Sequence, residues 1–213
     1  MISPTAMVFV IDDDQSVRKS LARMLDAAHY ALELFESASK FLARPAHPGP
    51  SCVIVDVQMP GLDGIELQKA LIQRGREEQL VFITGHGNIP MCADVMKAGA
   101  VDFLPKPFKR KELLESIERA LVRSAEQRQC ACEKNQARAL IEKLTPREHE
   151  VMQLVATGLL NKQVGGELGM AEKTVKTHRA HMMQKLGITS VADLMVVLQK
   201  AEVTPQVGPG TKV

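Results

Sequence analysis

The chain has 213 residues, enough for one large domain or two small ones. At 45% hydrophobic and 24% charged residues it can bury ordinary cores, which excludes wholesale disorder. Only 3% of the residues are aromatic, so the cores must be aliphatic and stacking platforms for single-stranded nucleic acid have few candidates. The longest apolar run near the N-terminus, Ala6 to Ile11, is far too short to span a bilayer. No Lys or Arg precedes that run as a signal peptide would require, so we expect a soluble protein with no membrane partner. The four cysteines lack a disulfide or metal-ligand spacing, which fits the reducing cytoplasm.

The charges are unevenly distributed along the chain. Residues 1–120 contain 14 Lys/Arg and 16 Asp/Glu, whereas residues 143–213 contain 9 Lys/Arg and 6 Asp/Glu. An acidic front and a basic back predict two domains with different chemistry.

The front half alternates short apolar runs with amphipathic segments. The strand-like runs are Met7 to Ile11, Ala31 to Phe35, Cys52 to Val55, Leu80 to Thr84 and Val101 to Leu104. The helix-like segments between them are residues 16–28, 37–43, 64–74 and 90–98. Five such units in about 120 residues predict an α/β domain over residues 1–121, with a doubly wound five-stranded parallel sheet covered on both faces.

A long helix is predicted next, because residues 108–145 contain no Gly or Pro and are rich in good helix formers. We place it at residues 109–142. Its first half has apolar residues at helical spacing, fit to pack on the sheet, whereas residues 123–138 are nearly all polar. Residues 122–142 are therefore predicted to be a solvated helical linker, unless a partner covers Ala125, Ala131 and Ala139.

The back half predicts a small all-α domain of four helices over residues 143–201. A capping box with proline at the first helical position, Thr145-Pro146-Arg147-Glu148, opens a helix that ends at Gly158. Further helices are predicted at residues 161–168, 172–186 and 190–201, and residues 202–213 form a flexible tail.

Polar residues follow four of the predicted strands at the point where each strand ends. They are Asp12, Asp13 and Asp14 after the first run, Asp56 after the third, Thr84 after the fourth and Lys106 after the fifth. Ligands of open parallel sheets bind at this edge, and crowded carboxylates repel each other unless a cation such as Mg²⁺ intervenes. A carboxylate there is a potential nucleophile that becomes an aspartyl-phosphate. Any one of these residues alone would be read as a helix cap or a surface lysine, but their convergence predicts phosphoryl transfer.

The segment at residues 172–186 fits the second helix of a helix-turn-helix. One face carries Val175, His178, Met182 and Leu186, which suit a small core. Another face carries Lys173, Lys176, Thr177 and Ala180, which suit a major groove. In isolation, a helix of this kind would more often be an amphipathic helix with an ordinary solvated basic face.

Together the front motifs resemble the receiver domain of two-component response regulators, in the NarL/FixJ family and its FixJ-like branch. These motifs are the Asp12-Asp13 pair, Asp56 with Met59-Pro60-Gly61 and Gly64, Ile83-Thr84-Gly85, and Lys106-Pro107-Phe108. The resemblance implies that Asp56 accepts a phosphoryl group from a phosphohistidine on a sensor histidine kinase. It further implies Mg²⁺ as cofactor, bound by Asp13, Asp56 and the backbone carbonyl of Gln58, with Asp12 reaching the metal through water.

The same resemblance assigns further roles in the front domain. Lys106 is expected to pair with the phosphoryl group, with a cis bond between Lys106 and Pro107. Thr84 and Phe103 are expected to switch rotamers, and the residues at Gln58 and His86 to tune how fast the phosphoryl group is lost. Phosphorylation is then expected to favour a homodimer through an apolar surface of the fourth helix, made of Ile89, Met91, Val95 and Met96, together with the fifth strand.

The back motifs are similar to the LuxR-type DNA-binding domain that ends NarL/FixJ regulators. They are Leu144-Thr145 with Glu148 and Glu150-Val151, Asn161-Lys162, Thr174-Val175-Lys176 with His178-Arg179, and Lys185-Leu186-Gly187. The implied partners are promoter DNA and RNA polymerase, and the implied role is that of an activator. The expected DNA-binding residues are Lys176 and Thr177 at base edges, Lys162, Lys173 and Arg179 on phosphates, and Thr174.

Two departures from the LuxR pattern predict a less stable back domain. Gly165 and Gly166 stand where good helix formers are usual, which costs about 1 kcal/mol each. Ala171 replaces a Ser or Thr cap, which costs about 1 kcal/mol more.

The chain as a whole resembles regulators of aromatic-hydrocarbon catabolism, such as styrene or toluene degradation.

The chief alternative is a Mg²⁺-dependent phosphohydrolase resembling the haloacid dehalogenase superfamily. Its motifs are imitated by Asp12-x-Asp14 with Ser16, the apolar run into Thr84, and Lys106. That family needs a further acidic pair after the lysine, which is missing, and gives no role to Asp56 or to a basic helix-turn-helix. A degenerate receiver that binds DNA constitutively would require a lost Asp, Thr or Lys, and none is lost.

Overall fold

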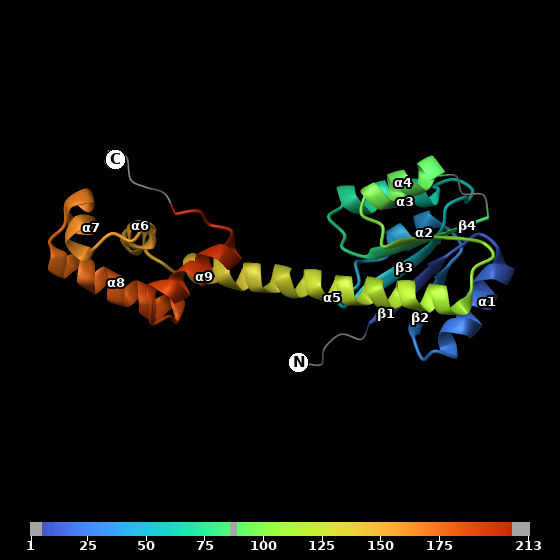
Figure 1. Ribbon diagram of the computed structural model, residues 1–213, viewed down its shortest axis with the longest axis horizontal. Coiled ribbons are helices and arrows are strands. Elements are labelled where there is room, and N and C mark those ends of the chain that lie inside the picture. Colours follow the sequence, from blue (N-terminus) through green and yellow to red (C-terminus); the bar gives the residue numbers. More distant parts are fainter. Residues whose placement is uncertain (1–5, 86–88, 206–213) are drawn as a thin grey trace. The chain divides into compact units, whose positions relative to one another are not determined.

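The computed structural model describes residues 6–85 and 89–205 and divides the chain into two compact units, Met1–Arg128 and Gln129–Val213 (Figure 1). Within the described residues, no helix is both long and apolar enough to cross a membrane. Each unit is described by itself below.

The first unit is a five-stranded, wholly parallel sheet with the strand order β2-β1-β3-β4-β5. Its strands are β1 (Met7–Ile11), β2 (Ala31–Phe35), β3 (Ser51–Asp56), β4 (Gln79–Thr84) and β5 (Asp102–Pro105). Its helices are α1 (Gln15–Asp26), α2 (Ala38–Ala43), α3 (Gly64–Gln73), α4 (Ile89–Lys97) and α5 (Arg110–Ile141), the last of which runs on into the second unit. The predicted doubly wound α/β fold is confirmed.

Two separate cores cover the two faces of this sheet. Phe9 and Ile11 point to one face, where they join buried residues of α2, α3 and α4, whereas Val8 and Val10 point to the other, where they join buried residues of α1 and α5. This alternation is the period of two that a strand imposes on its side chains. The central strands β3 and β4 are buried along their whole length, as expected for strands covered on both faces.

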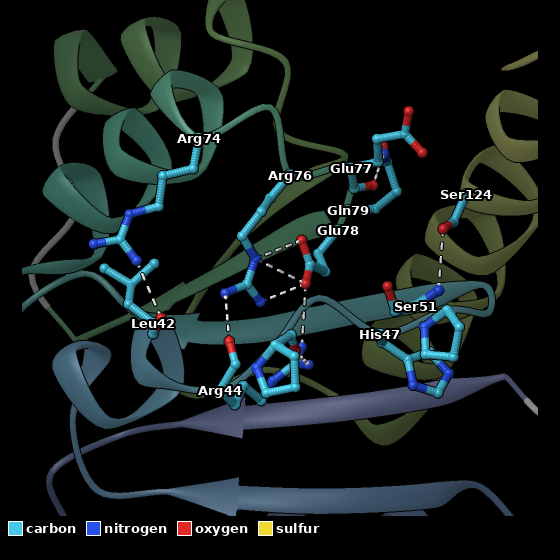
Figure 2. Close-up of polar contacts among 12 residues, drawn as sticks. Leu42, Arg44, His47, Ser51, Arg74, Arg76, Glu77, Glu78, Gln79 and Ser124 are labelled. Carbon is cyan, nitrogen blue, oxygen red and sulfur yellow. Dashed lines mark hydrogen bonds and ion pairs between the residues drawn. The ribbon is translucent and has the colours of Figure 1, made fainter.

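A polar network closes the amino end of the sheet (Figure 2). Glu78, whose side chain is fully buried, accepts hydrogen bonds from Arg76 Nη2 at 2.5 Å and Arg44 Nη2 at 3.2 Å. The Arg44 guanidinium also stacks 3.7 Å from the centre of the Phe9 ring. Together these contacts hold the segment between α2 and β3 against the start of β4.

The expectation that residues 123–138 are solvated is wrong at both ends of that stretch. Ser124 is buried and its Oγ accepts a hydrogen bond from the Ser51 backbone N–H at 3.0 Å, and Arg128 Nη2 donates to the His47 carbonyl at 2.7 Å. Farther along, Ala137 and Ile141 are buried in the core of the second unit. The polar composition of this stretch was misleading because the Ser124 and Arg128 side chains bind backbone groups at the amino end of the sheet instead of water. Ala125 and Ala139 are exposed and Ala131 is half-buried.

The second unit contains the end of α5 and the helices α6 (Pro146–Ala156), α7 (Asn161–Leu168), α8 (Glu172–Leu186) and α9 (Val191–Ala201). Both halves of the predicted capping box are present, since Thr145 accepts from the Glu148 N–H and Glu148 accepts from the Thr145 N–H. Gly169 and Gly187 end α7 and α8 with φ of 65°, a conformation that glycine adopts without strain. Of the expected tail, Glu202 pairs with Lys134 and Val203 packs on the core, whereas residues 206–213 lie outside the described residues.

Candidate phosphoacceptor and DNA-binding sites

Three carboxylates converge at the carboxyl ends of β1 and β3. Oxygen atoms of Asp12, Asp13 and Asp56 all lie within 4.8 Å of one another. The parallel register brings them together. Because Ile11 pairs with Val55, Asp12 directly after β1 and Asp56 at the end of β3 lie at the same edge of the sheet. Asp12 is fully buried, Asp56 is 9% exposed and Asp13 is exposed to solvent.

The Lys106 ammonium bridges two of these carboxylates. Its Nζ lies 2.9 Å from Asp12 Oδ2 and 2.7 Å from Asp56 Oδ2. The Lys106 backbone N–H donates to the Thr84 carbonyl at 2.7 Å. The peptide bond between Lys106 and Pro107 is cis, as predicted. The strand ends of β4 and β5 therefore aim this side chain at the acidic site.

Burial and pairing act in opposite directions on the ionisable groups here. Burial raises the pKa of Asp12 above its usual value, although hydrogen bonds from Lys106 and the Asp14 backbone oppose the rise. Burial alone would lower the pKa of Lys106, but its hydrogen bonds to Asp56 and Asp12 outweigh that effect and the pKa is raised. Lys106 is thus held as a cation between two acids.

The donor set of this site suits Mg²⁺. Three carboxylates and one ammonium leave a net charge of −2 when all are ionised, which one divalent cation balances. Carboxylate and carbonyl oxygens are the hard ligands that Mg²⁺ prefers, and the exposed Asp13 leaves a side open to water. The backbone N–H of Gln58 donates to Asp56 Oδ1 at 3.2 Å. The Gln58 side chain is exposed.

A close approach at Gly64 explains one glycine of the front motif. A Cβ atom added there would lie 2.5 Å from the Asp56 carbonyl oxygen and 3.2 Å from the Phe82 ring. Only glycine therefore lets the start of α3 pack against the end of β3 without displacing it.

The expected switch residues lie on neighbouring strands. Thr84 is fully buried at the end of β4. Phe103 is half-buried, stands opposite Phe82 across β4 and β5, and packs against the core on the α4 side of the sheet. His86, the other expected tuning residue, lies outside the described residues.

The expected apolar surface of α4 needs one correction. Val95 is only 1% exposed and belongs to the core, because it faces the sheet. Ile89 is 87% exposed and Met96 is 40% exposed, whereas Met91 is half-buried against the same core. The exposed apolar surface of α4 is therefore smaller than the sequence suggested.

Arg18 contributes to the acidic site although sequence reasoning did not single it out. Its Nη1 donates to the backbone carbonyls of Asp12 at 2.6 Å and Asp13 at 2.9 Å. The only sequence signal was an arginine one turn into the helix that follows the paired aspartates. That signal is weak, because an exposed basic residue on a helix is ordinary.

The two predicted faces of α8 are separated as expected. Val175, Met182 and Leu186 are buried, and His178 is half-buried. On the other face, Lys173, Thr174, Lys176, Thr177 and Ala180 are exposed, and Lys162 at the start of α7 is exposed as well. A cationic surface on the second helix of a helix-turn-helix suits the major groove of DNA.

Three of the expected DNA contacts already have partners within the protein. Thr177 Oγ1 donates to the Lys173 carbonyl at 3.1 Å, one helical turn back along α8. Arg179 Nη1 donates to Asn161 Oδ1 at 3.0 Å, which ties α8 to α7. Lys176 Nζ lies 3.3 Å from Glu172 Oε1, an exposed pair one helical turn apart. Such exposed pairs are worth only a few tenths of a kcal/mol, roughly, so Lys176 is easily released to a nucleic-acid ligand.

The two glycines of α7 are not equivalent. A Cβ on Gly165 would lie 2.6 Å from the Met170 carbonyl oxygen, whereas a Cβ on Gly166 would meet nothing within 4 Å. The expectation that both glycines merely weaken the helix is therefore incomplete, because Gly165 permits the close turn from α7 into α8. At Ala171, no side-chain bond caps α8, as expected.

Comparison with known proteins bears on both units. The family model of the response regulator receiver domain matches residues 8–118, and that of the bacterial regulatory proteins of the luxR family matches residues 142–198. The chain belongs to the response regulator family. It joins a receiver to a LuxR-type DNA-binding domain, the arrangement of the transcriptional regulators of two-component systems, so a sensor kinase and promoter DNA are its partners.

Full-length relatives support the assignment of this response regulator. It is 44% identical over 193 residues to nodulation protein W of Bradyrhizobium diazoefficiens, covering 91% of this chain and 85% of that protein. It is 38% identical over 200 residues to response regulator protein TodT of Pseudomonas putida, covering 94% and 88%. The low-resolution structure of response regulator StyR is similar with a TM-score of 0.83 at 46% identity, covering 92% of this chain and 99% of that one.

Proposed function

We propose that this response regulator is switched by a phosphoryl group on Asp56. The observation that carries the proposal is the Lys106 ammonium, which bonds to both Asp56 and Asp12 in a pocket of three carboxylates. A lysine held between two acids at the strand ends is placed to contact the oxygens of a phosphoryl group on one of them.

In the proposed reaction, an Asp56 carboxylate oxygen attacks the phosphorus of a phosphohistidine on the sensor kinase. The P–N bond breaks, a P–O bond forms, and the histidine nitrogen leaves with its electron pair. Asp13, Asp56 and the Gln58 carbonyl would hold Mg²⁺, with Asp12 linked through water, and the metal would neutralise charge on the transferred group. Water later attacks the phosphorus, the P–O bond to Asp56 breaks, inorganic phosphate leaves and the Asp56 carboxylate is restored. Gln58, exposed two residues after Asp56, is proposed to tune the rate of this step.

The phosphoryl group acts on the DNA-binding domain through an element with two arrangements. We infer that Thr84 turns toward the phosphoryl oxygens and Phe103 moves inward behind it. This rearrangement favours a symmetric homodimer through α4 and β5, where Ile89 and Met96 expose apolar surface. A dimer presents two copies of α8 and so gains DNA affinity by effective concentration.

On DNA, we propose that Lys176 and Thr177 reach base edges while Lys162, Lys173 and Arg179 hold phosphates, with Thr174 in the same surface. The bound dimer then recruits RNA polymerase as an activator. We place the receiver at residues 1–121, the linker at 122–142 and the DNA-binding domain at 143–201. Genes of aromatic-hydrocarbon catabolism are the proposed targets, which footprinting across the gene neighbourhood would test.

Intact-mass measurement tests the phosphoacceptor. With a small phosphodonor and Mg²⁺, the wild type should gain one phosphoryl group and Asp56→Asn none. Asp63→Asn is the matched control, since Asp63 caps α3 next to the site and an asparagine preserves the cap. An adduct that persists in Asp56→Asn would overturn the assignment, and catalytic release of phosphate from a monoester by that variant would favour the phosphohydrolase alternative.

A further inference from the structure

We propose that Arg18 is a positioning residue for phosphorylation, which holds the backbone of the acidic loop so that Asp12 and Asp13 face the metal. This inference rests on the proposed function, because it concerns the same Mg²⁺ and phosphoryl site. Arg18 lies one turn into α1, and its side chain runs back toward the start of the helix, as helical side chains do.

A single guanidinium nitrogen bridges two consecutive carbonyls. Arg18 Nη1 donates to the Asp12 carbonyl at 2.6 Å and to the Asp13 carbonyl at 2.9 Å. Both residues follow β1, which ends at Ile11, and Arg18 supplies a donor to each of their carbonyls. A charged donor makes stronger hydrogen bonds than a neutral one, so this contact restrains the turn between β1 and α1.

Other contacts restrain the residues on either side of Asp13: Asp14 caps α1 by accepting from the Ser16 N–H at 2.7 Å, and several contacts hold Asp12. The Asp12 N–H donates to the Phe35 carbonyl at 3.3 Å, and Asp12 Oδ1 accepts from the Asp14 N–H at 2.9 Å. Asp12 is also fixed by burial and by Lys106. Asp13 is exposed, and Arg18 restrains it through its backbone carbonyl.

The positive charge of Arg18 lies close to the acidic site, so the direction in which Mg²⁺ affinity changes on its removal tests the inference. A guanidinium close to the acidic pocket repels a divalent cation, so charge alone predicts that removing Arg18 strengthens Mg²⁺ binding. Restraint of the loop predicts the opposite, because a free loop must be ordered when the metal binds. The two explanations therefore differ in the direction of the change.

The test is a Mg²⁺ titration of the unphosphorylated full-length chain, followed by calorimetry or NMR. We expect Arg18→Met to raise the Mg²⁺ dissociation constant about three- to tenfold, with a smaller rise in Arg18→Lys, which keeps the charge and one flexible donor. Arg23→Met is the matched control, an exposed arginine in the last turn of the same helix, and should leave the constant unchanged.

Phosphorylation rates separate positioning from a general loss of structure. Under a small phosphodonor, the rate of Arg18→Met should recover toward that of the wild type as Mg²⁺ is raised, and faster amide exchange should be confined to residues 12–14. If Arg18→Met fails to fold, Arg18→Lys carries the same test.

Unchanged or tighter Mg²⁺ binding in a folded Arg18 variant would overturn the inference while leaving the proposed function intact. Failure of the wild type to form the Asp56 adduct would instead overturn the proposed function itself.

Discussion

Replacing Gly165 and Gly166 of α7 by alanine, one at a time, should change stability differently: Gly166→Ala should stabilise the second unit, and Gly165→Ala should leave it unchanged or destabilise it. Alanine is about 1 kcal/mol more favourable than glycine inside a helix, and both positions lie inside α7. At Gly166 the added methyl group meets nothing within 4 Å, so the whole gain should be realised. For a domain of this size, about 1 kcal/mol corresponds to a rise of roughly 4–8 °C in Tm.

At Gly165 the same gain is opposed by a backbone contact. The new Cβ would lie 2.6 Å from the Met170 carbonyl oxygen, whereas ordinary contact begins at 3.4 Å. Met170 lies in the turn between α7 and α8, so relief requires that turn to move. Overpacking of this kind costs about 1–3 kcal/mol, which makes Gly165→Ala neutral to about 2 kcal/mol destabilising.

Hydrogen exchange of the α7 and α8 amides in the full-length chain measures both changes, because it reports the second unit separately from the first. The expected result is slower exchange in Gly166→Ala and equal or faster exchange in Gly165→Ala. Equal stabilisation by both substitutions would refute the reasoning, since the turn at Met170 would then have room for a side chain.

Two further predictions concern the charges of the second unit. Glu148 is buried, and burial alone would raise the pKa of its carboxyl group. Hydrogen bonds from Lys185 at 2.6 Å and from the Thr145 backbone outweigh that effect and hold the pKa below the usual 4.5. A carboxyl pKa that is lowered in the folded protein gives stability that is present above pH 4.5 and is lost as the pH falls through the pKa of the folded state. Lys185→Met should therefore destabilise the second unit by about 1–3 kcal/mol at pH 7 and by less below pH 4. Urea titrations read by hydrogen exchange would show this, and a deficit that does not change with pH would contradict it. On DNA, Lys173→Ala should weaken binding to all sequences alike and reduce the salt slope of log K by about one unit per bound protomer, as measured by fluorescence anisotropy at several salt concentrations. Lys143→Ala, an exposed lysine outside α7 and α8, is the control, and an unchanged slope in Lys173→Ala would remove Lys173 from the phosphate contacts.

The sequence was most informative where periodicity and burial agree. The strands at Met7–Ile11 and Ala31–Phe35 have the predicted bounds, because each is a short apolar run beside polar turn residues. Helix α1 ends at Asp26, two residues before its predicted end. The chain leaves the helix through His29, which has a φ of 61°. Because this position is not a glycine, the sequence gives no signal for the turn.

The acidic site could be predicted because parallel strands end at one edge, so chain order alone brings Asp12, Asp56 and Lys106 together. Arg18 escaped prediction because it acts on backbone carbonyls, which carry no sequence signature. Contacts such as Arg128 with the His47 carbonyl escaped for a related reason. In sequence, a polar side chain that binds polar backbone looks the same as one that faces water.

The central claim is that phosphorylation of Asp56 controls DNA binding, and a single DNA titration tests it. The DNA would be a fragment from the gene neighbourhood that footprinting identifies, titrated with wild type and Asp56→Asn, each with and without phosphodonor and Mg²⁺, while sedimentation follows the oligomeric state. We predict that phosphodonor makes the wild type dimeric and tightens its DNA binding, and that Asp56→Asn responds in neither respect. A phosphorylated wild type that stays monomeric and binds DNA no more tightly would contradict the account and favour constitutive binding.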